Sequence, residues 1–315
     1  MGKQPSRDKL ANMTFPIEQQ KQVCAKIATD LGFDMNCGRL DASAHPFTSM
    51  IHSTDVRITT RYKESTFIES VTATIHETGH AIYEQNRPHN LGFPVPEALS
   101  MGVHESQSLL YERMVGLSPE FWDYYWDQLI VPSFPELEGA MNAEEFYRAI
   151  NMVEPGLIRV EADECTYPLH IILRTEIEQG LLGGSIKAKD IPDLWNAKMK
   201  EYLGVDVPSH REGFLQDIHW SMGYFGYFPT YLLGAVFAAQ IFDAAKAKLP
   251  SLPQQINTGE FQPLKQWLGE NIHTKELLYD NTNDLINAAS SKPVDVSIYN
   301  NYLNKKYSNL YAMKS

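Results

Sequence analysis

Two histidines and a glutamate in one short stretch carry the groups that metal-assisted hydrolysis requires. His76, Glu77 and His80 lie in the sequence HETGH, within residues 70–87. On an α-helix, positions four apart lie above one another on the same face, so both imidazoles can reach one metal ion. Glu77 lies about 100° around such a helix from His76, close enough to hold a water molecule. The pattern HExxH therefore predicts two zinc ligands and a general base.

A third ligand is expected from a second helical stretch further along the chain. Residues 97–116 have a helical pattern and contain the sequence HESQS, in which Glu105 supplies a carboxylate. In one type of HExxH site, a downstream glutamate completes a His₂Glu set and leaves one position open for water. Residues 88–96 have the composition of a tight connection that would bring the second helix back. Without this third ligand, the alternative is that the motif is two surface or core histidines that hold no metal.

The residues around HETGH predict a helix that is fixed by packing against a core. Residues 86–90 include a proline and polar side chains that would end this helix. Apolar side chains recur near helical spacing at Phe67, Ile68, Val71, Ile75 and Ile82.

Residues 55–62 are the best strand candidate, because polar and β-branched residues alternate there. The polar side, with Asp55, Arg57 and Thr59, points one way. It could face solvent or line a cleft beside the metal helix. By contrast, residues 38–41 read as a loop.

Residues 157–163 could form a second short strand, and their charged side chains are costly to bury unless they are paired. Arg159 stands in an otherwise apolar run, where an unpaired cation would be unfavourable. We expect Glu161 or Asp163 as its internal partner if its role is structural. The alternative is a functional site.

Residues 213–220 form a loop or helix start that is rich in hydrogen-bonding side chains. A single histidine beside a tryptophan, such as His219, is more often structural than catalytic. Tyr227 follows in an aromatic stretch whose simplest interpretation is core packing.

The remaining pattern is mainly helical, with no repeat and no long flexible linker, so one domain over residues 1–315 is expected. A helix over residues 17–31 should end at Gly32. The other helices are expected at residues 119–129, 143–153, 168–182, 191–203, 229–246, 261–272 and 298–310.

The composition is that of a soluble globular protein, with 43% hydrophobic and 21% charged residues. A net charge of -12 argues against nucleic acid or an anionic membrane as a partner. Three cysteines without a metal-binding or disulfide pattern favour a reducing compartment. The first residues lack an apolar signal segment, so a cytoplasmic location is expected.

Five motifs in a fixed order resemble one family of peptidases. DVRIT, HETGH, HESQS, IRVEAD and GFLQDIHW follow one another as in the thermostable carboxypeptidase Taq family of metallocarboxypeptidases. The resemblance runs from about residue 38 to residue 231 and is weaker beyond, with a poor match at 271–296. It implies a mainly α, gluzincin-like helical fold with a small β-sheet beside a deep active-site groove, usually in a homodimer.

The resemblance also implies a role for individual residues. The metal would be held by His76, His80 and Glu105, with Glu77 as the base. Arg159 would bind the terminal carboxylate of a peptide, and His219 would also contact substrate. We add Tyr227 as a further candidate for substrate binding. Members of the family carry a long helical portion ahead of the strand motif, so this sequence is interpreted as a short form.

The expected function is a metal-dependent carboxypeptidase that releases single amino acids from the C-terminus of peptides by means of activated water. One divalent ion per chain is expected, with zinc first and cobalt or manganese as alternatives, because a His₂Glu set accepts all three. Two other functions stay open. One is a non-catalytic peptide-binding or scaffold relative. The other is an endopeptidase that uses the same site.

Overall fold

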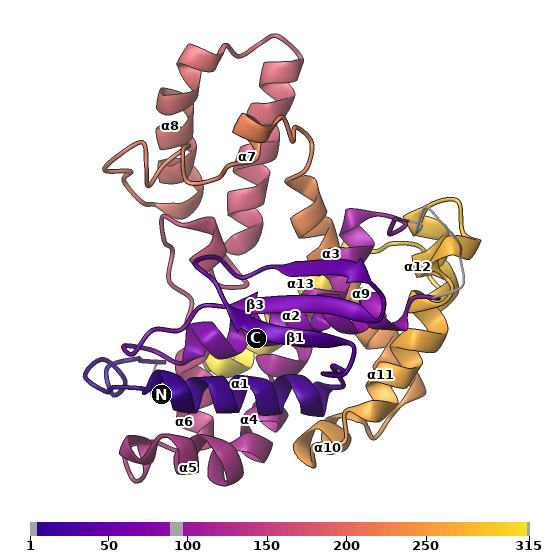
Figure 1. Ribbon diagram of the computed structural model, residues 1–315. Coiled ribbons are helices and arrows are strands. Elements are labelled where there is room, and N and C mark those ends of the chain that lie inside the picture. Colours follow the sequence, from indigo (N-terminus) through magenta and orange to yellow (C-terminus); the bar gives the residue numbers. More distant parts are fainter. Residues whose placement is uncertain (1–4, 89–96, 314–315) are drawn as a thin grey trace. The chain divides into compact units, whose positions relative to one another are not determined.

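The structure is a computed structural model that describes residues 5–88 and 97–313. Helices dominate these residues, and the sheet has three strands (Figure 1), so the mainly α fold with a small sheet is confirmed. The chain divides into two compact units. Unit 1 contains Met1–Ile150 and Gly234–Ser315, and unit 2 contains Asn151–Leu233. That both units form one catalytic domain stays a prediction. Most of the expected connection at 88–96 lies outside the described residues.

The sheet of unit 1 has the strand order β1-β3-β2. The central strand, β3 (Asp55–Thr60), pairs in parallel with β1 (Gly38–Ala42) and antiparallel with β2 (Thr48–His52). The predicted strand at 55–62 is therefore confirmed, whereas the predicted loop at 38–41 is wrong. Gly38 lies so close to β3 that a Cβ there would be 2.1 Å from the carbonyl oxygen of Val56.

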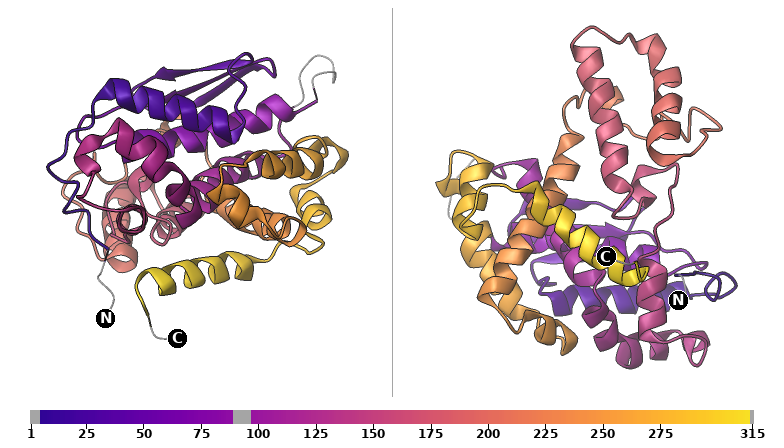
Figure 2. Two further views of the ribbon diagram at one scale, coloured as in Figure 1. Left: turned by 90° about the horizontal axis from the view of Figure 1, so that it is seen from below. Right: turned by 180° about the vertical axis from the view of Figure 1, so that it is seen from behind.

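Two helices pack on one face of this sheet (Figure 2), namely α1 (Ile17–Leu31) and α2 (Ile68–Asn86). Val56 and Ile58 of β3 are fully buried in a cluster that also includes Ala28 and Ala81 of the two helices. Burying each such valine or isoleucine contributes roughly 1.5–3 kcal/mol. Arg57, between them, points to the other face and is exposed. Of the two interpretations of this polar side, solvent exposure therefore applies to Arg57.

The first helix has the predicted bounds. It ends at Leu31 because Gly32 adopts a left-handed conformation, with φ of 110°. The backbone N–H of Gly32 donates to the carbonyl oxygen of Thr29, which closes the last turn of the helix.

The other helices of the described residues agree with the predicted segments in most places. Three short helices, at residues 131–133, 252–257 and 282–290, were not predicted, and three predicted helices, at 97–116, 119–129 and 261–272, each continue as a π-helical turn. The bounds are α3 (Met101–Leu109) with a π-helix at Leu110–Gly116, α4 (Pro119–Tyr125) with a π-helix at Trp126–Ile130, α5 (Val131–Ser133), α6 (Ala143–Ile150), α9 (Pro229–Lys248), α10 (Leu252–Asn257), α11 (Gln262–Leu268) with a π-helix at Gly269–His273, α12 (Thr282–Ser290) and α13 (Val296–Leu310). Among the helices described, none is both long and apolar enough to cross a bilayer.

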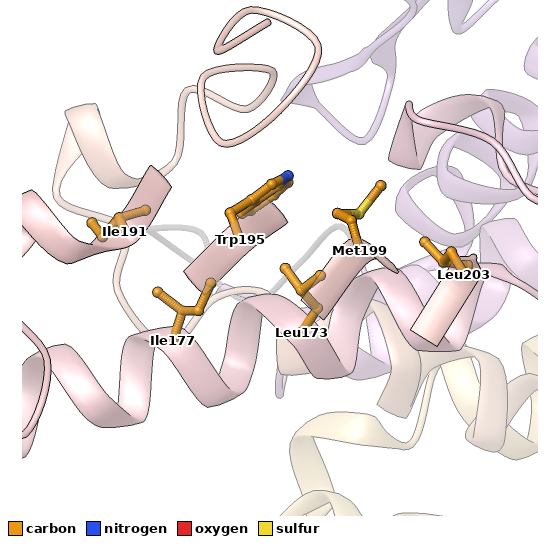
Figure 3. Packing of buried hydrophobic residues seen from close by; sticks show 6 residues of the cluster. All are labelled: Leu173, Ile177, Ile191, Trp195, Met199 and Leu203. Atoms are coloured by element: carbon orange, nitrogen blue, oxygen red, sulfur yellow. The ribbon is translucent and has the colours of Figure 1, made fainter. Parts of the chain in front are cut away.

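Unit 2 is built on two helices, α7 (Tyr167–Leu182) and α8 (Ile191–Leu203). Apolar side chains of both helices interlock (Figure 3), and Trp195 of α8 is almost completely buried among them. The predicted strand at 157–163 is wrong, because the chain forms a 3₁₀ turn at Arg159–Glu161. The backbone N–H of Arg159 donates to Oε1 of Gln216 at 2.8 Å, and so it is not available to a neighbouring strand.

Candidate metal centre

Three predicted ligands converge in unit 1. Nε2 of His76 lies 4.0 Å and Nε2 of His80 lies 3.4 Å from Oε2 of Glu105. One ligand atom from each side chain lies within 4.8 Å of the other two. The two histidines come from α2, and Glu105 comes from α3.

Two glycines let the backbones approach closely enough for this convergence. A Cβ on Gly79, inside HETGH, would be 2.5 Å from the carbonyl oxygen of Gln107, so α2 and α3 are in backbone contact there. A Cβ on Gly234 of α9 would be 2.7 Å from Cγ of Glu105. Glu105 is therefore enclosed between two helices, and its carboxylate is directed toward the histidines.

The donor set fits a divalent ion. Zinc binds imidazole nitrogen and carboxylate oxygen at roughly 2.0–2.2 Å, which places neighbouring ligand atoms of a tetrahedral site about 3.4 Å apart. The separations of 3.4 and 4.0 Å between the imidazoles and Glu105 are close to this value. The three ligands leave a fourth position open, as catalytic zinc sites do.

His76 is oriented by a second carboxylate. Its Nδ1 lies 2.6 Å from Oε2 of Glu112, so the imidazole proton sits there and Nε2 remains directed toward Glu105. Burial lowers the pKa of His76, but the hydrogen bond to Glu112 and the charge of Glu105 outweigh it and raise the pKa to about 9. Glu112 lies in the π-helical turn that follows α3, a type of distortion common at functional sites.

The charge of Glu105 is also stabilised at this site. Burial raises the pKa of Glu105, but the hydrogen bond with His80 and the charge of His76 lower it to about 2. Burial and the neighbouring His104 lower the pKa of His80. An anionic carboxylate beside a neutral imidazole is the form in which both groups bind a metal ion.

Glu77, the predicted base, is buried on α2 with only 6% of its surface exposed. The hydroxyl of Thr48 on β2 donates to its Oε2 at 2.6 Å, and so one carboxylate oxygen is fixed by the sheet. β2 therefore positions the candidate base, although no strand was predicted at 48–52.

The predicted substrate residues lie in unit 2, where Arg159 meets Asp217. Nε and Nη2 of Arg159 donate to Oδ1 of Asp217 at 3.0 and 2.7 Å. Nε of Arg174 donates to the other oxygen, Oδ2, at 2.7 Å. The predicted partners Glu161 and Asp163 are therefore wrong for Arg159.

Arg159 does not pair with the two nearby acids, Glu161 and Asp163, because neither carboxylate is directed toward it. Asp163 accepts backbone N–H groups of Cys165 and Thr166 and so fixes the start of α7. Glu161 is exposed. A partner 58 positions away was favoured because the guanidinium is buried with the 213–220 loop.

His219 and Tyr227 lie in the same cluster of unit 2. Nε2 of His219 is 2.9 Å from the hydroxyl of Tyr231, and its ring centroid is 5.5 Å from that of Tyr227. The guanidinium carbon of Arg159 lies 4.6 Å from the ring centroid of Tyr231, in the geometry of a cation–π contact. Burial and the charge of Arg159 lower the pKa of His219. The neutral imidazole is therefore the favoured form.

The sequence analysis did not predict several residues of the site, although the spacing of two of them could have indicated their position. Glu112 is seven positions after Glu105, two helical turns along the same face. Glu84, which contacts the metal-site neighbour His104, is four positions after His80. Thr48 had no such signal, because only the pairing of β2 brings it to Glu77.

A helix with the HExxH motif and a glutamate beside it places the protein in the class of metallopeptidases. The sequence profile described as "Carboxypeptidase Taq (M32) metallopeptidase" matches residues 1–307. The chain belongs to this family.

Relatives and solved structures agree with this assignment. Carboxypeptidase 1 of Bacillus subtilis is 43% identical over 304 residues, which cover 95% of this chain and 60% of the relative. Thermostable carboxypeptidase 1 of Thermus thermophilus is 42% identical over 99% of this chain and 60% of its own length. The M32 carboxypeptidase of Deinococcus radiodurans has a TM-score of 0.94 at 39% identity, over 99% of this chain and 62% of that one. The chain thus spans about 60% of the length of these curated relatives.

Proposed function

We propose that this protein is a metal-dependent carboxypeptidase that removes single amino acids from the C-terminus of peptides. The observation that carries the proposal is the convergence of His76, His80 and Glu105, whose ligand atoms lie within 4.8 Å of one another. The relatives that cover most of this chain are named carboxypeptidases. These names support cleavage at the C-terminal end of the peptide, which the metal site alone does not specify.

The proposed ion is zinc, held by His76, His80 and Glu105. When bound, it would supply Lewis-acid polarisation of the peptide carbonyl and lower the pKa of water. Glu77 would accept the proton of the attacking water and later donate it to the leaving amine. Because the hydroxyl of Thr48 donates to Oε2 of Glu77, the other oxygen, Oε1, is the proposed proton acceptor.

The proposed recognition of the substrate carboxylate rests on the charges of unit 2. Arg159 and Arg174 share one carboxylate, that of Asp217, so this buried cluster has one positive charge in excess. Arginine suits a terminal carboxylate because its planar fork makes two parallel hydrogen bonds. His219 and Tyr227, beside Arg159, are the proposed further contacts. The homodimer and the cytoplasmic location remain predictions.

The test of the proposed function compares blocked peptides that end in a free carboxylate with the same peptides amidated. Leaving a buried charge without its partner costs about 2–5 kcal/mol, so we expect the free acids to be cleaved at least about thirtyfold more efficiently. Arg159→Lys keeps the charge but loses the fork, and so it should raise KM for the acids.

The amidated peptides serve as the control for that variant, because their slow cleavage should be almost unaffected by Arg159→Lys. The quantity to measure is kcat/KM for the released amino acid. Equal cleavage of acids and amides by the wild type would contradict the proposed carboxypeptidase function and indicate an endopeptidase. Zinc binding without any cleavage would indicate the non-catalytic peptide-binding relative.

Zinc affinity should rise with pH. In the metal-free protein, His76 has a pKa raised to about 9, so below that pH its proton must leave before the nitrogen can bind. Affinity should therefore increase up to about tenfold per pH unit between about pH 6 and pH 9, measured by competition with a chelator.

The control for this prediction is Glu112→Gln. It removes the carboxylate whose hydrogen bond raises the pKa of His76, so the rise in affinity should move to lower pH. An affinity that stays constant or falls over this range in the wild type would contradict the assignment of His76.

A further inference from the structure

A chain of buried polar side chains leads away from the proposed ligand His80. Nδ1 of His80 lies 2.6 Å from Nδ1 of His104, and Nε2 of His104 lies 2.8 Å from Oε1 of Glu84. Oε2 of Glu84 accepts from Arg87 at 3.1 Å, and Arg87 in turn donates to Glu276 at 2.7 Å. Every link except the two histidines is at least 90% buried.

The hydrogen-bond roles in this chain follow from the requirement that each contact has one donor and one acceptor. If Nε2 of His80 offers its lone pair to a metal, its proton is on Nδ1 and is donated to His104. Nδ1 of His104 is then the acceptor, so its own proton is on Nε2 and is donated to Glu84. Burial raises the pKa of the Glu84 carboxyl, but the contacts with His104 and Arg87 together lower this pKa below its usual value.

We propose that His104 and Glu84 are positioning residues that hold His80 in its metal-binding tautomer and orientation. The proposal rests on the metal site proposed above. His76 has a carboxylate directly on its Nδ1, namely Glu112, whereas His80 reaches a carboxylate only through a second imidazole. Both ligand imidazoles would then be supported by an anion, which raises their basicity toward a cation.

The far end of the chain explains why Glu84 keeps this position. Arg87 contacts both Glu84 and Glu276, and Glu276 also accepts from the backbone N–H of Leu99 and from the hydroxyl of Tyr83. Of these contacts, the one from Arg87 reaches the second oxygen of Glu84, so the first oxygen of Glu84 remains directed at His104, whereas the hydroxyl of Tyr83 contacts Glu276 and not Glu84. α2 supplies His80 and Glu84, Arg87 directly follows the last residue of α2, and α3 supplies His104, immediately before the ligand Glu105.

The test is the zinc affinity of His104→Ala and Glu84→Gln, measured by competition with a chelator. Changes in such supporting residues typically cost about 10–100-fold in metal affinity, and we expect His104→Ala to fall in this range. Glu84→Gln keeps a hydrogen-bond acceptor but loses the charge, so it should weaken zinc binding by less.

The matched control is Tyr83→Phe. It keeps the ring that packs on His104, with centroids 4.9 Å apart, and removes only the hydroxyl at Glu276. It should lower the thermal stability of the zinc-free protein without changing zinc affinity. The ¹⁵N chemical shift of Nδ1 in His80 gives a second readout, because a protonated Nδ1 is expected in the zinc-loaded wild type and a changed tautomer population in His104→Ala.

The possible outcomes separate this proposal from the metal site itself. Wild-type zinc affinity in folded His104→Ala would overturn the role of His104, as would an equal loss in Tyr83→Phe. If His104→Ala does not fold, the zinc affinity of Glu84→Gln is compared with that of the wild type instead. An unchanged affinity in Glu84→Gln would then overturn the proposal. A wild type that binds no zinc would instead refute the metal site.

Discussion

Glu77→Gln should abolish most peptide cleavage while zinc binding and the fold are retained. The amide cannot accept a proton from water, and general-base contributions are typically about 10² to 10⁴-fold, so kcat should fall by that factor. The fold should survive because the amide oxygen can still accept the hydrogen bond from Thr48. The measurements are kcat on free-acid peptides and zinc content by elemental analysis.

Thr48→Val is the matched variant for this prediction. It leaves the carboxylate of Glu77 in place but removes the hydroxyl that fixes Oε2, so its kcat should fall by less than that of Glu77→Gln. A loss below about tenfold in Glu77→Gln would show that this residue is not the base.

His80→Ala should abolish stable zinc binding. In zinc sites with four protein ligands, the binding free energy is roughly 10–16 kcal/mol, so the loss of one ligand costs on the order of 10² to 10³ in affinity. We therefore expect wild-type protein to retain one zinc ion per chain after gel filtration, and His80→Ala to retain almost none. Elemental analysis and chelator competition measure both quantities.

His45→Ala is the control for that experiment, because His45 is an exposed histidine of unit 1 and is not part of the site. Its zinc content should equal that of the wild type. Unchanged zinc content in His80→Ala would remove His80 from the ligand set and, with it, the basis for the role of His104.

Local information in the sequence was sufficient for the helices and for part of the site. The spacing of His76 and His80 fixes both imidazoles on one face of any helix that contains them, whatever surrounds it. The end of α1 at Leu31 was predictable because Gly32 can adopt positive φ at little cost.

The partners of these residues could not be predicted, because they come from elements distant in the sequence. Residues 38–41, which were expected to form a loop, form a strand because their backbone pairs with the edge of β3. Arg159 pairs with Asp217 rather than with the adjacent acids, since the fold of unit 2 buries these two side chains together. A local pattern can specify a backbone conformation and the face that a side chain occupies. Which side chains meet across two elements depends on how closely their backbones pack, and at Gly79 and Gly234 only the tertiary structure revealed that approach.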